Sequence, residues 1–172
     1  EAEAEKLIQN IIPVLSEKAG ALPVTERDPV ALDWFNGRRT PDANHTLKGA
    51  VTGLNLGTDA PRMFKALVEA TAFGAKRIVE RFQSEGVPIR QLIGIGGVSK
   101  KSPFVMQTLA NVLNMTIKIV QSEQACALGA AVCAATAAGI YPDMSTAQAA
   151  MASIYDAEFQ PQAEKVGVYE KL

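Results

Sequence analysis

The residues with the clearest chemical potential in this sequence form a glycine-rich turn. The short apolar run 92–95 leads into Gly96 and Gly97, and Ser102-Pro103 then has the composition of a helix start. Glycines let the main chain approach a ligand closely, and a helix N-terminus offers unpaired N–H groups and positive potential. This segment therefore predicts a site that accepts an anionic or nucleotide ligand.

Two common phosphate-binding motifs do not fit this turn. The dinucleotide fingerprint needs a third glycine three residues after Gly96, where Ser99 stands. The Walker loop needs Gly-Lys-Ser or Gly-Lys-Thr, whereas this turn continues as Ser99-Lys100-Lys101. A plainer interpretation therefore stays open, in which the glycine pair only makes a sharp turn and the two lysines are solvated.

The other residues that could bind metal or form disulfides carry little signal. His45 is the one histidine and has no histidine or cysteine partner, so zinc chemistry is not indicated. Cys126 and Cys133 lie in a predicted helix, where their Cα atoms would be about 10 Å apart, too far for a disulfide. We expect both to be free and buried, which is typical of a cytoplasmic protein.

Hydrophobic spacing and capping residues predict the elements that position the turn. A long amphipathic helix over 60–85 begins after Thr58 or Asp59 and ends at Gly86. The residues from about 155 onward are expected to be a polar tail. Further elements are predicted as follows: helices over 1–18, 102–114, 123–138 and a short segment capped by Ser145-Thr146, strands over 91–95 and 116–120, and a short strand allowed within 30–35. This alternation predicts an α/β fold with a sheet covered by helices.

Composition places the chain among ordinary globular proteins. It has 172 residues, a net charge of -1 and 48% hydrophobic residues, which suits about one domain. A balanced charge gives no electrostatic case for a nucleic-acid or membrane-surface binder, and no apolar run is long enough to span a bilayer. We therefore expect neither nucleic acid nor membrane among its partners.

Four segments in order resemble the FGGY carbohydrate kinases, and within them the ribulokinases. The glycine turn with its continuation to Met106-Gln107 resembles the adenosine motif of that family, with the longer spacing found in ribulokinases. The resemblance covers nearly the whole chain, and it rests on these segments: Leu32-Asp33-Trp34-Phe35-Asn36-Gly37-Arg38-Arg39-Thr40-Pro41, Leu54-Asn55-Leu56-Gly57-Thr58-Asp59-Ala60-Pro61, Gly96-Gly97-Val98-Ser99-Lys100-Lys101-Ser102-Pro103-Phe104-Val105-Met106-Gln107 and Cys126-Ala127-Leu128-Gly129-Ala130-Ala131.

The resemblance implies a fold and a place within a larger enzyme. It implies a ribonuclease-H-like domain of the actin and hexokinase type, the C-terminal, ATP-side lobe of a two-lobed kinase. Residues 1–172 would be this lobe, incomplete at the N-terminal edge. An N-terminal lobe would bind the sugar and supply the catalytic aspartate, so the resemblance predicts that this chain alone does not phosphorylate a sugar. The activity implied is the phosphorylation of L-ribulose to L-ribulose 5-phosphate in L-arabinose catabolism, with ATP and Mg²⁺.

The resemblance also assigns candidate binding residues. Gly96 and Gly97 match the glycines that pass against the adenosine, and Lys101 and Ser102 occupy positions near which many members carry asparagine. Ser102 is shorter than that asparagine and can also cap the helix that follows it. Gln107 is at least as well explained by helix packing, the small-residue helix at 129–131 by tight packing, and Arg38 with Arg39 by solvation.

No residue of this chain is assigned as a catalytic base. Asp33, Asp42 and Asp59 fall at turns or caps and are better explained structurally. Two alternatives stay open: a kinase for another pentulose, such as xylulose, or a non-catalytic module for nucleotide binding or dimerisation. The apolar helices allow a homodimer.

Overall fold

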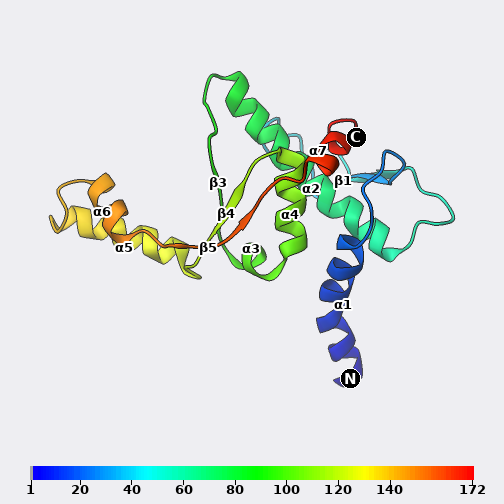
Figure 1. Cartoon of the computed structure of the whole chain (residues 1–172), viewed down its shortest axis with the longest axis horizontal. Helices are drawn as coiled ribbons and strands as arrows, with labels where there is room; N and C mark the ends of the chain where they lie inside the picture. Colours follow the sequence, from blue (N-terminus) through cyan, green and yellow to red (C-terminus); the bar gives the residue numbers. More distant parts are fainter. Residues whose placement is uncertain (1) are drawn as a thin grey trace.

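The computed structural model describes the backbone of residues 2–172 and the side chains from residue 10 onward. Two helices at the centre, α2 and α4, pack against each other, and a small sheet lies beside them (Figure 1). The elements in chain order are α1 (Ala2–Gly20), β1 (Val30–Leu32), β2 (Ala50–Thr52), α2 (Ala60–Ser84), β3 (Leu92–Gly94), α3 (Gly97–Lys101), α4 (Pro103–Leu113), β4 (Ile117–Val120), α5 (Ala125–Ala137), α6 (Met144–Met151), β5 (Tyr155–Phe159) and α7 (Ala163–Tyr169).

The long helix α2 forms where its capping signals predict it. The Asp59 carboxylate accepts a hydrogen bond from the Arg62 backbone N–H at 3.0 Å, which satisfies one of the free N–H groups of the first turn. At the other end Gly86 adopts φ +81°, and the Val87 N–H donates to the Phe82 carbonyl at 2.9 Å. Local chemistry thus sets both ends of the longest helix.

Helix α4 is also bounded by its own sequence. The Ser102 hydroxyl accepts a hydrogen bond from the Val105 N–H at 3.4 Å, and Asn114 ends the helix in the left-handed conformation at φ 49°. Its inner face meets the sheet in a core cluster, and the buried members of that cluster are Met106, Ala110, Ile117 and Ile119. The predicted helix over 102–114 is confirmed, and it holds the glycine turn at its N-terminal end.

The central sheet has the order β3-β4-β5. Strand β3 pairs parallel with β4, with Leu92 opposite Ile117, so the link through α3 and α4 is a crossover. Strand β5 pairs antiparallel with β4, with Ile117 opposite Phe159. The two predicted strands are confirmed. A separate antiparallel pair joins β1 to β2, with Ala31 opposite Val51.

The prediction of a polar tail from about residue 155 onward is wrong. Tyr155–Phe159 forms β5, and Ala163–Tyr169 forms α7. Strand β5 is exposed at four of its five positions, so its sequence lacks the apolar alternation of a half-buried strand. It forms because the edge of β4 offers unpaired backbone groups, which are remote in sequence.

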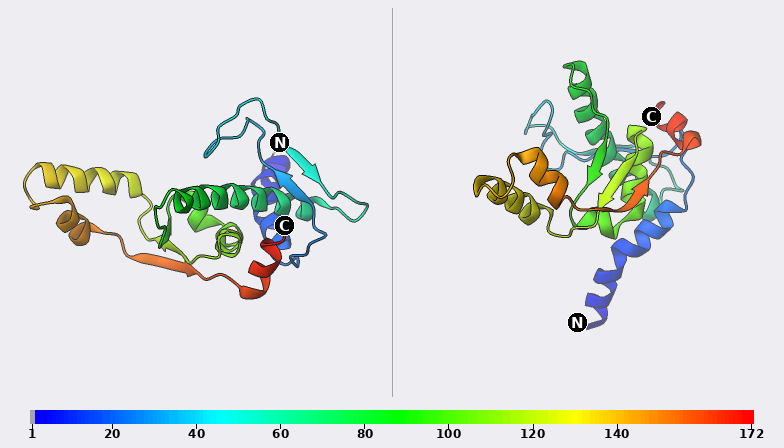
Figure 2. Two further views of the ribbon diagram at one scale, coloured as in Figure 1. Left: turned by 90° about the horizontal axis from the view of Figure 1, so that it is seen from above. Right: turned by 60° about the vertical axis from the view of Figure 1, so that its left-hand side comes forward.

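Helices α5 and α6 form a hairpin that projects away from α2 and α4 (Figures 1 and 2). The cap of α6 is Asp143, which accepts from the Thr146 N–H at 2.8 Å, and not the predicted Ser145-Thr146. Cys126 and Cys133 are free, as expected, but both are exposed. The expected burial is wrong because the small-residue helix packs mainly against α6 and leaves most of its surface open.

Helix α1 runs unbroken through Pro13 and packs against α2 and α4 near its C-terminal end. Ala19 is 1% exposed there, whereas Ile11 and Ile12 are about half exposed, at 53% and 54%. The predicted helix over 1–18 is therefore confirmed, and its apolar side chains at positions 11 and 12 are only partly covered. The side chains of Leu7 and Ile8 lie outside the described part of the chain.

Candidate functional site

The glycine turn between β3 and α3 has open space beside its two glycines. Gly96 adopts φ +84°, a conformation that residues with a Cβ rarely take. A Cβ built on Gly96 or Gly97 would meet no atom within 4 Å. The bend is therefore not filled by neighbouring side chains, and a flat ligand group has room to lie beside this main chain.

A buried serine holds the turn in shape. Ser99 is 6% exposed, and its hydroxyl donates a hydrogen bond of 2.7 Å to the Gly96 carbonyl. This bond fixes the direction of the peptide group between Gly96 and Gly97, so the open face of the turn is preorganised. In the sequence, Ser99 breaks the dinucleotide fingerprint and lies in the segment that resembles the FGGY family, and no hydrogen-bonding role was predicted for it.

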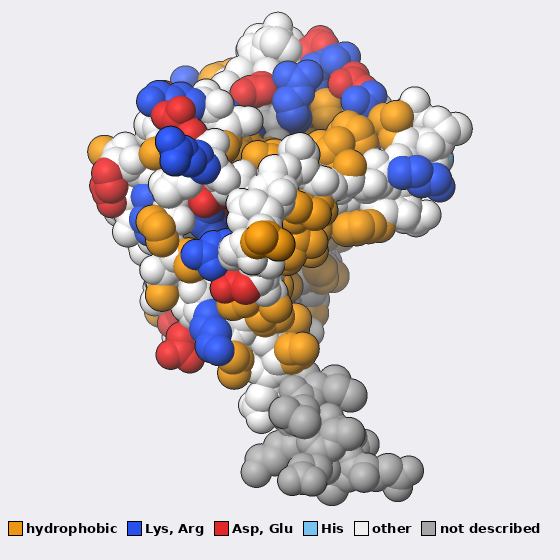
Figure 3. Space-filling view, turned by 90° about the vertical axis from the view of Figure 1, so that its right-hand side faces the viewer, with side chains coloured by type: hydrophobic (Ala, Val, Ile, Leu, Met, Phe, Trp, Pro, Cys, Tyr) orange, Lys and Arg blue, Asp and Glu red, His pale blue; other side chains and the backbone are white. Residues whose placement is uncertain are grey.

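The turn opens into a groove of about 880 Å³, within the size range of small-molecule and cofactor sites. Four helices line it, because α1, α2, α3 and α4 converge at this end of the molecule. Figure 3 shows one face of the protein, on which hydrophobic side chains gather in a band that rises from the N-terminal helix. The residues that line the groove are Ile12, Pro13, Ser16, Glu17, Phe64, Gly97, Val98, Lys101, Ser102, Pro103, Phe104 and Val105.

Two aromatic rings give the groove a flat apolar wall. Phe64 of α2 and Phe104 of α4 stack with ring centroids 6.1 Å apart and planes inclined by 30°. Both residues line the groove, so this part of its lining is apolar and aromatic.

The two lysines of α3 have different environments. The Lys100 ammonium donates to the Gln121 carbonyl and lies 3.7 Å from Asp156 Oδ2, so it ties α3 to the sheet. Lys101 lines the groove, is exposed, and forms no ion pair within the part of the chain whose side chains are described. Lys101 is thus the cation that a bound anion would meet.

Three of the four predicted binding residues line this groove: Gly97, Lys101 and Ser102. Gly96 precedes them and shapes the turn. Ser102 also caps α4, so its oxygen accepts the helix bond while its hydrogen stays available to a ligand. The four residues lie within seven positions of sequence. The other lining residues, which the sequence did not assign as binding residues, are Ile12, Pro13, Ser16, Glu17, Phe64, Val98, Pro103, Phe104 and Val105.

Other residues considered in the sequence lie outside the groove. Gln107 donates to Asn111 Oδ1 at 3.1 Å and to the Gln160 carbonyl at 2.8 Å, so its role is packing of α4 against the C-terminal segment. The groove lining likewise includes none of the described residues of α5. Gly129 of α5 has open space around it.

The prediction that Arg38 and Arg39 are both solvated is wrong for Arg38. Arg38 lies over the Trp34 ring at 5.4 Å, and its Nε donates to the Asp42 carbonyl at 2.7 Å. Arg39 is exposed, as expected. The contact of the Arg38 guanidinium with the Trp34 indole orders the loop that follows β1. This loop lies near the middle of α2, whereas the groove lies near the N-terminal end of that helix.

The aspartates at turns and caps have structural partners. The backbone N–H of Arg62 and then its guanidinium hold the pKa of the Asp59 carboxyl below its usual value. Asp33 Oδ2 accepts from the Thr71 hydroxyl at 3.3 Å, and Asp42 pairs with Arg81 at 3.4 Å. Among residues 10–172 no three histidine, cysteine, aspartate or glutamate side chains gather as a metal site would need.

The sequence profile of the FGGY family of carbohydrate kinases, C-terminal domain, matches residues 3–138. The chain belongs to the FGGY family. Within the described part of this FGGY domain, no helix is both long and apolar enough to cross a bilayer. The expected family and the fold of the actin and hexokinase type are confirmed.

Curated relatives of the FGGY domain are similar over almost its entire length. It is 46% identical over 176 residues to a ribulokinase of Vibrio parahaemolyticus, covering 98% of this chain and 31% of the relative. It is 44% identical to a ribulokinase of Bacillus licheniformis, covering 100% of this chain and 32% of the relative. The chain therefore spans about a third of the length of the curated relatives it matches.

Solved structures share the fold at low identity. A xylulose kinase from Brucella ovis superposes with a TM-score of 0.82 at 22% identity, covering 99% of this chain and 36% of that one. A ligand-bound xylulose kinase from Lactobacillus acidophilus gives 0.81 at 24% identity, covering 91% and 31%. These superpositions show that the chain shares the fold of both kinases.

Proposed function

We propose that this chain is the nucleotide-binding, C-terminal domain of an ATP-dependent ribulokinase that converts L-ribulose to L-ribulose 5-phosphate in L-arabinose catabolism. One observation carries the nucleotide part: the unobstructed main chain at Gly97 lines a groove that Phe64 and Phe104 also line, and Gly96 precedes it in the same open turn. The ribulokinase relatives at 46% and 44% identity support the choice of sugar.

The residues of the groove fit the parts of ATP in a definite order. The apolar wall and the glycine main chain would hold the purine, because neither presents a side chain that blocks a flat ring. The Ser102 hydroxyl would donate to the ribose or base, and the Lys101 ammonium would attract the phosphates. Bound ATP supplies the transferable phosphoryl group, with Mg²⁺ neutralising its charge.

The chemistry also needs groups that this chain would not provide. Phosphoryl transfer requires the acceptor hydroxyl in line with the phosphate and a base for its proton. We assign the sugar site and the catalytic aspartate to a second domain, outside residues 1–172. We also propose that residues 1–172 lack the N-terminal edge of the nucleotide-binding domain. Mg²⁺ would be held by the phosphates together with groups outside this chain. The 172-residue chain by itself is therefore expected to give no turnover.

The setting of the protein belongs to the same proposal. We place it in the cytoplasm, where free thiols such as Cys126 and Cys133 persist. The substrate is a small sugar, and a homodimer is a further proposed state. Light scattering of the full-length protein would decide between monomer and dimer.

The test compares sugars in a coupled kinase assay on the full-length protein. L-ribulose is expected to give the largest kcat/KM, with D-xylulose and glycerol as competing acceptors. A preference for D-xylulose would move the proposal to the other pentulose kinase. Binding of MgATP without turnover on any sugar would favour the non-catalytic nucleotide module, and turnover by the 172-residue chain would contradict the assignment of the base.

A further inference from the structure

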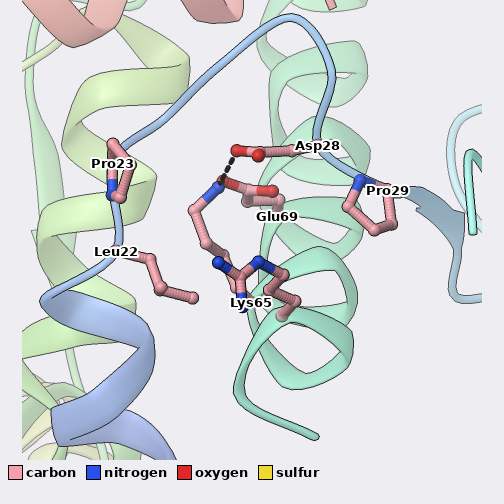
Figure 4. Close-up of a pocket in the computed structure, with 7 residues that line it drawn as sticks. Leu22, Pro23, Asp28, Pro29, Lys65 and Glu69 are labelled. Atoms are coloured by element: carbon pink, nitrogen blue, oxygen red, sulfur yellow. Dashed lines mark hydrogen bonds and ion pairs between the residues drawn. The ribbon is translucent and has the colours of Figure 1, made fainter. Parts of the chain in front are cut away.

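A buried cluster of charged groups lies on α2, away from the walls of the groove. The Lys65 ammonium donates to Asp28 Oδ2 at 2.7 Å and pairs with Glu69 Oε1 at 2.8 Å (Figure 4). Lys65 and Glu69 are 4% and 3% exposed. Burying charges is costly unless they are paired, so this cation and its two carboxylates act as one unit.

The C-terminal helix joins the same unit. The Tyr169 hydroxyl donates to Glu69 Oε1 at 2.7 Å, and Tyr169 is 4% exposed. Burial, and then the neighbouring Glu69 carboxylate, raise the pKa of Tyr169, so the hydroxyl keeps the proton that it donates. The network Asp28–Lys65–Glu69–Tyr169 therefore ties together three segments: the loop before β1, α2 and α7.

The loop that carries Asp28 leads directly from α1. Leu22 and Asp28 line a cavity of about 30 Å³ together with Lys65 and Glu69, so both ends of the loop meet at the network (Figure 4). Val24, between them, packs against the core cluster that contains Tyr169. The loop is thus held near both of its ends and at Val24, and it begins where α1 ends.

The position of α1 matters because this helix is one wall of the groove. Four of its residues line the groove, and they are Ile12, Pro13, Ser16 and Glu17. They lie one to two helical turns from the loop. A shift of the loop relative to α2 would therefore widen or narrow the groove between α1 and the Phe64–Phe104 wall.

We propose that the Asp28–Lys65–Glu69–Tyr169 network positions α1 as a wall of the nucleotide groove, with Asp28 and Tyr169 as positioning residues. This inference rests on the proposed nucleotide-binding function. A well-packed apolar cluster would stabilise the fold as well as buried ions do. The charged network differs because its short hydrogen bonds fix one direction of approach between loop and helix.

The experiment uses the full-length protein with Asp28→Asn, which leaves the Lys65–Glu69 pair intact. We expect about three- to thirtyfold weaker MgATP binding by calorimetry, the range typical of residues that act through a neighbouring element. Amide hydrogen exchange over residues 10–20 should become faster, whereas the KM for the sugar should not change. Tyr169→Phe, which keeps the ring, should change the same quantities in the same direction.

Lys171→Ala is the matched control. Lys171 joins the same C-terminal segment to the same loop, through an ion pair with Glu26 at 2.7 Å, but both side chains are more than half exposed. This variant should leave MgATP affinity and hydrogen exchange at their original values.

The outcomes separate this inference from the function on which it rests. If the unchanged protein binds no MgATP, both the proposed function and this inference are wrong. If the unchanged protein binds MgATP and Asp28→Asn binds it equally well, only the positioning role is overturned. Equal losses of sugar and nucleotide affinity, together with a lower melting temperature, would likewise overturn it, because they indicate general destabilisation.

Discussion

Lys100 and Asp156 connect α3 to β5, with 3.7 Å between the ammonium nitrogen and Oδ2. The contact occupies one lysine of the Lys100-Lys101 pair and leaves the other to the groove. Neighbouring residues of the same type therefore have different roles, which gives a direct test of the site.

We predict that Lys101→Gln weakens MgATP binding by about tenfold, as expected for the loss of a charge-assisted contact. The affinity difference should shrink at high salt, because ions screen an exposed cation. Lys100→Gln is the control and should leave the affinity within twofold of the original value. If calorimetry shows that Lys101→Gln and Lys100→Gln weaken MgATP binding equally, Lys101 makes no direct contact with the nucleotide.

Gly96→Ala should lower both stability and nucleotide affinity. Gly96 has φ +84° and ψ −179°, a region that is open essentially to glycine alone, so alanine there costs about 1–3 kcal/mol of unfolding free energy, and relief of that strain would distort the turn. Gly86→Ala is the comparison, because Gly86 also has a positive φ, +81°, and open space around it, at the end of α2. It should lower stability in urea unfolding and leave MgATP affinity unchanged. A loss of affinity in both variants would attribute the effect to stability alone.

Gly97→Ala should separate binding from folding. Gly97 lies at the start of α3 without a positive φ, so alanine is tolerated there and stability should stay equal or rise slightly. The added methyl group would enter the space assigned to the purine and weaken MgATP binding by about tenfold, in line with the cost of overpacking. Gly129→Ala lies inside α5 and also in open space, so it should raise stability by up to about 1 kcal/mol and leave MgATP affinity unchanged. If Gly97→Ala binds MgATP as tightly as the original protein, the proposed position of the purine beside this turn is wrong.

Lys65→Met should destabilise the protein strongly. Removing the cation leaves Asp28 and Glu69 as uncompensated carboxylates, a change that costs about 3–5 kcal/mol where the ions are buried. Arg77→Met, which breaks the exposed pair with Glu80 at 3.2 Å, should cost less than about 1 kcal/mol. Unfolding in urea measures both values. Similar small losses would mean that the Lys65 network is not a buried unit in solution.

Acid should destabilise the protein through two paired carboxylates. Burial raises the pKa of Asp28, but the hydrogen bonds from Lys65 and Thr25 outweigh it and hold the pKa below the usual 3.8. The backbone N–H of Arg62 lowers the pKa of Asp59 in the same sense. A lowered pKa in the folded state adds stability above 3.8, and that stability is lost as the pH falls through the folded values.

The unfolding free energy should therefore fall between about pH 5 and pH 2. The fall should be shallower in the double variant Asp28→Asn with Asp59→Asn, because both titrating groups are gone. Urea titrations at several pH values measure the slope. An identical slope in the original and double-variant proteins would contradict the assignment.

Local signals predicted much of the frame. The capping residues of α2 and α4 interact with backbone groups only a few positions away, so the ends of both helices follow from the sequence alone. These residues are Asp59, Gly86, Ser102 and Asn114. The exposed strand β5 and the helix α7 were missed, because β5 is stabilised by pairing with β4 and not by its own pattern. The burial of Cys126 and Cys133 was wrong for a related reason, since composition alone does not say what covers a helix.

The sequence by itself determined the glycine turn, its capped helices and the family to which they belong, because backbone freedom and capping act over short stretches of chain. The tertiary structure alone decided which residues face the turn. Phe64 and Phe104 meet only when α2 packs on α4, and Tyr169 reaches Glu69 across 100 positions of sequence. Such contacts depend on the summed packing of many side chains, and no local pattern encodes the partner of a given residue.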